Sequence, residues 1–337
     1  MPSISVDQLR EYLRRQSVAE LSGSIDVRPN GALPDEQRFA LASGSGRYEC
    51  IVFAPSAAER ARRMISGLRL AGSVNLAPVL VLADEAGAAL GGPVVVASAP
   101  GGASLGDRQL NDEEVQGWLF LLLTLHHLAP ASVGVVSEMS PDAAAWWQRS
   151  QAAWETVRGA YSAPPFQPLV ETLTRLRAIA SVRLETNRQL WEGIQRRPCH
   201  GNPVPANLVR MGGRLMLIEW ESFGLGDPAM DVGRAAALAT LTGELTPEQY
   251  IRFVSDYLAG MRDTRDTTLE ERLRVFSSVL PLGFCFALLG VLAQARGMDR
   301  AERARHVEQV ARALQWIHET LGIEVGDIAG LVAPLRG

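Results

Sequence analysis

A polar, glycine- and proline-rich island with short strands lies between residues 199 and 231, in a stretch whose flanks are helical in pattern. Two apolar runs, at 207–210 and 214–219, flank the dipeptide Gly212-Gly213, a turn signal that predicts a hairpin. An acidic loop, ESFGLGDPAMD, follows the second run. Polar side chains at the ends of short buried strands are the usual setting of a functional site, so we expect the site of this protein here.

The first hundred residues predict a small sheet. Two apolar runs, RFALAS at 38–43 and RYECIVFA at 47–54, are separated by Gly44-Ser45-Gly46 and therefore predict a β-hairpin. The chain between two of the predicted strands, at 56–72, has a helical pattern, and residues 7–20 predict a short amphipathic helix. The predicted strands cover residues 24–29, 38–43, 47–54, 77–84 and 92–99. A mostly antiparallel sheet with one helix is the simplest arrangement of these elements.

Pro100-Gly101-Gly102 marks a break, and helical patterns dominate after it. The predicted helices cover residues 111–129, 141–159, 165–196 and 232–322. A length of 337 residues exceeds one compact domain. We therefore expect an α+β protein with a β-rich small lobe at 1–100 and a helical lobe at 101–337.

Residues 275–295 carry no charge and are just long enough to span a bilayer. They contain Pro281 and Gln294 as well as two glycines and two serines, and no second segment of this kind occurs. We therefore predict a buried core helix rather than a membrane span. The first residues of the chain lack the apolar core of a signal peptide.

Composition narrows the class of function. The net charge of −4 argues against nucleic acid or an anionic membrane as a partner. The three cysteines are far apart, which favours neither a disulfide framework nor a zinc site and fits a reducing cytoplasm. All 33 basic residues are arginines, so no lysine ammonium is available for chemistry.

The island resembles the catalytic segment of the aminoglycoside phosphotransferase and choline kinase-like family, which has a bilobal, protein-kinase-like fold. The family pattern reads H-G-D-x-x-x-x-N, then an apolar residue followed by D-[WFP]-E, then G-D-P-x-x-D. The matching residues are His200, Gly201, Asn207, Trp220, Glu221, Gly226, Asp227, Pro228 and Asp231. The resemblance extends over most of the chain, since residues 1–100 are similar to the small lobe and LLLTLHHLAP to a leucine-rich helix of the family.

Two positions of the site depart from the family pattern. Asn202 stands where the family has its catalytic Asp, and an amide can orient a hydroxyl group but cannot accept its proton. Glu219 stands where the family has its magnesium-binding Asp, which keeps the charge on a longer side chain. The resemblance thus implies Asn202 and His200 as catalytic positions, and Asn207 and Glu219 as metal ligands.

The small lobe departs from the family pattern as well. Kinase-like enzymes place a lysine on the third strand as a phosphate clamp, paired with a glutamate of the next helix. Here the clamp position falls near Val52 or Phe53, which are both apolar, and the phosphate loop at 30–34 holds one glycine. The arginines that could replace the clamp and bind the nucleotide are Arg28, Arg38 and Arg47.

Structural roles compete with chemical ones for these residues. His200 is expected to brace its loop, Asp227 and Asp231 to hold backbone N–H groups at a helix start, and Asn207 to act as either brace or ligand. Glu219 follows an apolar strand, and a buried unpaired carboxylate is costly, so we expect a metal or an arginine beside it.

Two functions therefore compete. The first is a degenerate kinase, or pseudokinase, with a binding or scaffold role and a protein partner. The second is an active phosphotransferase that uses ATP or GTP with Mg²⁺ and phosphorylates a hydroxyl of a small molecule or peptide. A third hypothesis is a partner subunit in natural-product or modified-peptide biosynthesis.

Overall fold

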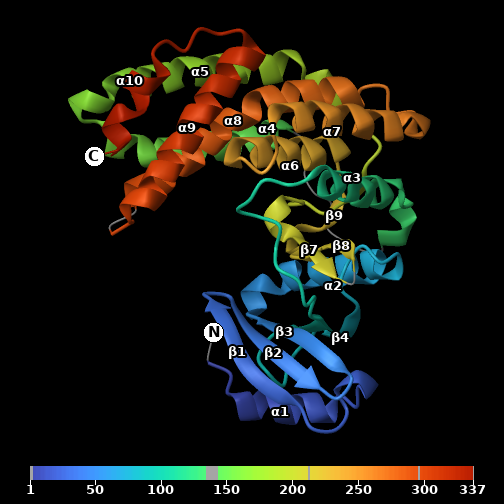
Figure 1. Ribbon diagram of the computed structural model, residues 1–337. Coiled ribbons are helices and arrows are strands. Elements are labelled where there is room, and N and C mark those ends of the chain that lie inside the picture. Colours follow the sequence, from blue (N-terminus) through green and yellow to red (C-terminus); the bar gives the residue numbers. More distant parts are fainter. Residues whose placement is uncertain (1–2, 134–142, 212, 295–296, 337) are drawn as a thin grey trace. The chain divides into compact units, whose positions relative to one another are not determined.

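The computed structural model describes residues 3–133, 143–211, 213–294 and 297–336 (Figure 1). The chain forms two compact units, and each draws on more than one segment. The first unit comprises Met1–Gly106, Asn111–Met139 and Arg197–Gly226. The second unit comprises Asp107–Leu110, Ser140–Arg196 and Asp227–Gly337. The first unit contains residues from both sides of the predicted lobe boundary at residue 100. The division into lobes at residue 100 stays a prediction.

The first unit is built on a five-stranded antiparallel sheet with the order β1-β2-β3-β5-β4 (Figure 1). Its strands are β1 (Asp26–Leu33), β2 (Glu36–Ser43), β3 (Gly46–Phe53), β4 (Leu80–Asp84) and β5 (Val94–Ser98). Helix α1 (Val6–Arg15) packs its apolar residues against those of the sheet, and α2 (Ala58–Ser73) follows β3. The predicted small antiparallel sheet is confirmed, and so is the hairpin between β2 and β3.

The segment expected to form a phosphate loop is part of a strand instead. β1 runs to Leu33 and pairs with β2, so the chain reverses within Pro34 and Asp35. A register shift between Pro29 and Gly31 lets β1 continue past a proline, which has no N–H for the ladder. The hairpin therefore ends in a two-residue turn that is followed at once by Glu36.

The rest of the first unit holds the motif island. Helix α3 (Asp112–His127) begins at the Asn111 cap and lies beside β6 and β8. The predicted hairpin is confirmed as β7 (Leu208–Met211) paired with β8 (Arg214–Leu217), although Gly212 of its turn lies outside the described residues. A second pair, β6 (Arg197–Cys199) with β9 (Gly224–Gly226), frames the island and was not predicted.

The second unit is helical (Figure 1). Its α-helices are α4 (Ala143–Val157), α5 (Gln167–Thr186), α6 (Pro228–Thr242), α7 (Pro247–Gly260), α8 (Leu269–Gln294), α9 (Arg300–Leu321) and α10 (Ile328–Val332). The α7 start at Thr246 forms the capping box that its sequence predicts. Trp154 of α4 stacks on Phe286 of α8 with ring centroids 5.1 Å apart.

Helix α8 is the helix long and apolar enough to cross a membrane among the described residues, and 72% of its most apolar window is buried inside the protein. It packs against α4, α5, α6 and α9. The prediction of a buried core helix at 275–295 is confirmed up to Gln294, since Ala295 lies outside the described residues.

A buried ion triad ties the start of α6 to α8. The Asp227 side chain accepts a hydrogen bond from the Ala229 N–H, as expected for a residue that holds a helix start. Arg272 of α8 is fully buried and donates to both oxygens of Asp227, at 3.0 and 2.9 Å. The same guanidinium donates to both oxygens of Asp266, at 2.9 and 2.7 Å.

The triad yields a prediction about stability. Arg272→Met leaves two carboxylates without their cation, so the free energy of unfolding should fall by about 3–5 kcal/mol. Urea unfolding followed by circular dichroism measures this. The matched control is Arg274→Met, because Arg274 is exposed on the same helix and its loss should stay within about 0.5 kcal/mol. Equal unfolding midpoints for the two variants would contradict the prediction.

Candidate functional site

His200 braces the island from inside. Its side chain is fully buried, and Nε2 lies 2.8 Å from the Ile218 carbonyl oxygen, to which it donates. Nδ1 accepts from the Asn202 backbone N–H at 3.3 Å, so both ring nitrogens are used within the loop. The ring also meets Trp220 edge-on, with centroids 4.6 Å apart. These contacts give His200 a positioning role.

Gly201 lets the chain turn between His200 and Asn202. Its φ of +84° lies in the left-handed region, which disfavours residues with a Cβ. A Cβ there would also lie 2.5 Å from the Ser222 carbonyl oxygen, too close for any side chain. The island therefore needs a glycine at this position.

The two asparagines of the island are linked. The Asn207 amide donates from Nδ2 to the Asn202 carbonyl oxygen at 2.8 Å, so Asn207 does act as a brace. This bond uses the nitrogen end of the amide and leaves the oxygen Oδ1 as an available acceptor or ligand. The half-buried Asn202 side chain has no hydrogen-bond partner among the described residues. It is the polar group of the loop that could contact an added molecule.

Glu219 pairs with Arg38 of β2. Arg38 donates Nη1–H to Oε1 at 2.6 Å and Nη2–H to Oε2 at 2.9 Å, so one guanidinium occupies both carboxylate oxygens. This hydrogen-bonded pair lowers the pKa of Glu219 despite its partial burial. The expectation of a metal or an arginine beside Glu219 is thus met by an arginine. Whether Asn207 and Glu219 bind a metal stays a prediction.

The backbone of Glu219 is also unusual, with φ of 61° and ψ of 58°. A non-glycine residue in this left-handed region costs about 1–2 kcal/mol. Such strain persists where surrounding contacts fix the residue, and it concentrates at functional positions. Here the two hydrogen bonds from Arg38, together with strand β8, which precedes Glu219 in the chain, hold Glu219 in place.

Arg60 of α2 extends the pair into a network. It donates to Glu221 at 2.8 Å, to Asp35 at 2.5 Å and to Glu36 at 2.6 Å. Glu36 is fully buried and also accepts from Arg38 at 2.6 Å, so it links the two guanidinium groups. Sequence reasoning missed Arg60 and Glu36, since nothing local signals that α2 and the β1–β2 turn meet the island.

The network carries more negative than positive charge. Five carboxylates, from Asp35, Glu36, Glu49, Glu219 and Glu221, surround Arg38 and Arg60, which gives a net charge of −3 when all are ionised. Burial raises the pKa of Glu221, and the neighbouring charges of Glu36 and Glu219 raise it further. Burial likewise raises the pKa of Glu49.

The clamp position is apolar and closed. Val52 and Phe53 are fully buried, and Arg60 lies over the Phe53 ring at 5.8 Å. Glu59, at the start of the next helix, pairs with Arg62 and Arg63 of its own helix. The family pairing of a strand cation with a helix carboxylate is therefore reversed here, with Arg60 on the helix and Glu36 on the strand.

The other two predicted nucleotide-binding arginines lie apart from this network. Arg28 of β1 is exposed and pairs with Asp26 at 2.8 Å. Arg47 is exposed at the start of β3. Of the three candidates, the structure brings Arg38 to the island, and a role for any of them in nucleotide binding stays a prediction.

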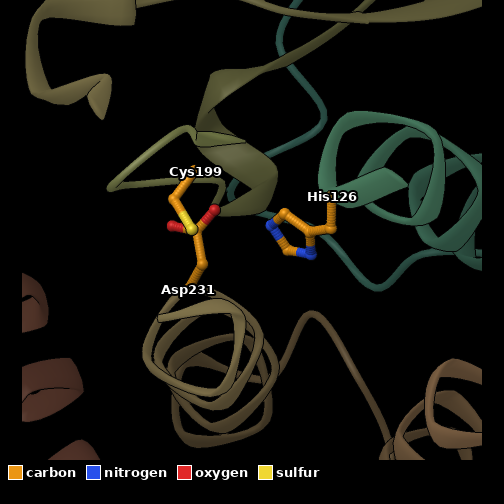
Figure 2. A group of neighbouring side chains, drawn as sticks. All are labelled: His126, Cys199 and Asp231. Atoms are coloured by element: carbon orange, nitrogen blue, oxygen red, sulfur yellow. The ribbon is translucent and has the colours of Figure 1, made fainter. Parts of the chain in front are cut away.

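Figure 2 shows His126 of α3 and Cys199 of β6, which are both buried in the first unit. Their ligand atoms lie within 4.8 Å of each other. Asp231, also drawn, belongs to the first turn of α6 in the second unit. Two donors within one unit are too few for a structural zinc site, which needs four. His126 and His127 form the last turn of α3, where a helix favours partial positive charge.

The five-stranded sheet, the helical unit and the island define a kinase-like α+β fold. Solved structures share it: choline kinase LicA from Streptococcus pneumoniae has a TM-score of 0.55 and 16% identity, covering 92% of this chain and 99% of that one. An ethanolamine kinase from Plasmodium vivax has a TM-score of 0.56 and 11% identity, covering 89% and 85%. A spectinomycin phosphotransferase solved with ADP and spectinomycin has a TM-score of 0.56 and 14% identity over both full chains.

Sequence comparison identifies the family. Residues 26–267 match the phosphotransferase enzyme family (APH), and the chain belongs to this family. Among curated proteins, protein LicA of Haemophilus influenzae is 42% identical over 48 residues. That match spans 14% of this chain and 18% of the length of LicA. The resemblance on which the site residues were chosen is thereby confirmed.

The pair of Arg38 and Glu219 yields a pH-dependent prediction. Arg38→Met should lower the free energy of unfolding at pH 7 by about 1–3 kcal/mol, the range for hydrogen bonds to charged groups. The folded pKa of Glu219 lies below its unfolded value of about 4.3, so the pair stabilises fully above that pH. Its contribution disappears as the pH falls through the folded pKa.

Urea titrations of wild type and Arg38→Met from pH 7 downward measure the difference. The gap between the two proteins should narrow once the pH drops below about 4. Arg47→Met is the control, because Arg47 is exposed in the same sheet and its loss should change little at any pH. A gap that stays constant down to the acid limit would contradict the assigned role of the ion pair.

Proposed function

We propose that this member of the phosphotransferase family is a degenerate kinase that acts as a binding or scaffold protein. The observation that supports this most directly is that Arg38 donates hydrogen bonds to both carboxylate oxygens of Glu219. A magnesium ion at Glu219 would have to displace a guanidinium that already holds both carboxylate oxygens. With this geometry the residues present do not fit the metal, and we derive no reaction step through it.

The charge of the network supports the same proposal. The triphosphate of a nucleotide would approach five carboxylates and two guanidinium groups that are already paired with them. In kinases a lysine and metal ions offset phosphate charge at this place. Here the clamp position is filled by Val52 and Phe53. The β1–β2 turn ends in Asp35 and is followed by Glu36, where a phosphate loop would carry glycines.

After the metal site and the phosphate clamp, the catalytic base is the third part of a kinase site that this chain lacks, because Asn202 stands in its place. An amide has no basicity and cannot accept the proton of an acceptor hydroxyl, a step that commonly contributes about 10²–10⁴-fold in rate. The side chain can still hydrogen-bond to a bound molecule. The proposed role is thus recognition of a protein partner, or of a small molecule or peptide, within the cytoplasm.

The alternative is an active phosphotransferase that uses ATP or GTP with Mg²⁺. One observation favours it: Asn202 and the oxygen end of Asn207 remain open for ligands beside Glu219. The solved structures that share the fold are named choline kinase, ethanolamine kinase and spectinomycin phosphotransferase, and the last of these contains ADP. Phosphoryl transfer can proceed by positioning and electrostatics, because its transition state is loose.

Nucleotide binding separates the two functions first. Thermal-shift titrations with ATP and GTP, each with and without Mg²⁺ or Mn²⁺, should leave the melting temperature of wild type unchanged. A ligand at 100 times its Kd stabilises the folded protein by about 2.7 kcal/mol, which such titrations detect. A metal-dependent rise in melting temperature that Glu219→Ala abolishes would support the active phosphotransferase instead.

The position of the lost base supplies a second test. If the proposed function is right, Asn202→Asp should give no gain in ATP turnover, because nothing holds the nucleotide. A triple variant that adds Glu219→Asp and Phe53→Lys should be needed before turnover appears. Asn111→Asp, which makes the same change at an exposed helix cap, serves as the control. A gain of about 10²–10⁴-fold from Asn202→Asp alone would refute the proposal.

A further inference from the structure

A cavity of about 370 Å³ lies among α4, α6 and α8 in the second unit. This volume falls within the range of pockets that bind small molecules. Its polar lining comes from Arg149 and Ser150 of α4 and Arg234 of α6, and its apolar walls include Trp146 and Phe284. Trp146 is only partly covered by the protein, because it faces this cavity.

The charge of the cavity is positive. Arg149 and Arg234 both line it, and no carboxylate is among the described residues of its wall. Burial lowers the pKa of Arg234, and the charge of Arg149 lowers it further, while Asp231 on the same helix opposes these effects only in part. Arg234 is half-buried and Arg149 is exposed, and the repulsion between their guanidinium groups is relieved when an anion lies between them.

The apolar wall is fixed in place. The Trp146 indole meets the Phe276 ring edge-on, with centroids 5.1 Å apart and an interplanar angle of 76°. It also lies directly against Gly283 of α8, where a Cβ would come within 2.7 Å of the indole ring. A side chain at residue 283 would therefore push the indole out of its position. The wall is thus preorganised for a flat apolar group.

We propose that this cavity binds a small organic anion with an aromatic or apolar body. The carboxylate or phosphate monoester group would meet the Arg149 and Arg234 guanidinium groups, and the body would pack against Trp146 and Phe284. Arginine suits this role because its planar fork binds both carboxylate and phosphate in pairs of hydrogen bonds. The proposal goes beyond the function proposed above, since it requires neither a nucleotide nor a metal.

A charge series of one ring system tests the proposal. Isothermal titration calorimetry of the full chain, without nucleotide or metal, would compare indole-3-acetate, the neutral tryptophol and the cationic tryptamine. We expect the anion to bind at least tenfold more tightly than tryptophol, equivalent to about 1.4 kcal/mol, and tryptamine to bind most weakly. Phenyl phosphate in a separate titration distinguishes a preference for phosphate from one for carboxylate.

Variants link the binding to the cavity. Arg149→Met and Arg234→Met should each weaken the anion at least tenfold and leave tryptophol unchanged. Arg149 is exposed, so its variant keeps the test valid should Arg234→Met fail to fold. Gly283→Val should weaken every member of the series by displacing Trp146. Arg188→Met, which removes an exposed arginine of the same unit outside the cavity, should bind like wild type.

Three results would overturn the proposal. One is equal affinity for the anion, the neutral and the cationic ligand. The second is an Arg149→Met variant that binds indole-3-acetate like wild type. The third is the absence of any binding of either anion with a Kd below about 1 mM. None of these results bears on nucleotide binding, so failure here is distinguishable from failure of the proposed function.

Discussion

Two guanidinium groups compensate a cluster of one buried and four half-buried carboxylates, and they link distant segments of the first unit. Arg38 and Arg60 join the β1–β2 turn, strand β3 and helix α2 to the island that carries Glu219 and Glu221. Arg38 and Glu219 are 181 residues apart in the chain. Without the two cations, five carboxylates would repel one another in a partly desolvated place, which costs far more than exposed pairs return.

The same compensation explains the altered chemistry of the site. A guanidinium is always charged and presents a rigid fork that matches a carboxylate. Arg38 therefore holds Glu219 more specifically than a lysine would, and it uses both oxygens that a metal needs. The chain has no lysine, so its charge clusters are built from arginine throughout. The result is a family fold whose central carboxylate serves an ion pair.

Local sequence patterns predicted most elements of the fold. Alternating apolar residues around Gly44-Ser45-Gly46 predicted the β2–β3 hairpin, and Gly212-Gly213 between two apolar runs predicted the β7–β8 hairpin. The pair of β6 and β9 escaped prediction because strands of three residues have no period to detect. The two-residue turn at Pro34 and Asp35 escaped it because a bulge carried β1 past Pro29.

The site was predictable to a smaller extent, for a physical reason. The cost of a buried carboxylate predicted a partner for Glu219, and Arg38 was one of three named arginines. The sequence contains no signal that Arg60 would meet Glu221, because the pair spans 161 residues and depends on how α2 packs beside the island. The asparagine at residue 202 was visible as a departure from the motif, whereas the reversed pairing, with a cation on helix α2 and a carboxylate on strand β2, was not.

The bidentate ion pair of Arg38 and Glu219 also constrains which substitutions this chain could accept during evolution. Replacing Arg38 alone takes the guanidinium from Glu219 and one of the two cations from Glu36. Replacing Glu219 alone leaves a half-buried guanidinium without its bidentate partner, so either first step lowers stability. Under the proposed function, an aspartate at residue 202 brings no advantage while Arg38 holds both oxygens of Glu219. Under the proposed function, a lineage that regained phosphotransfer would have to pass through several less stable intermediates before selection for activity could act. Under the proposed function, the ion pair therefore keeps the family fold stable while it disfavours a return to phosphotransfer.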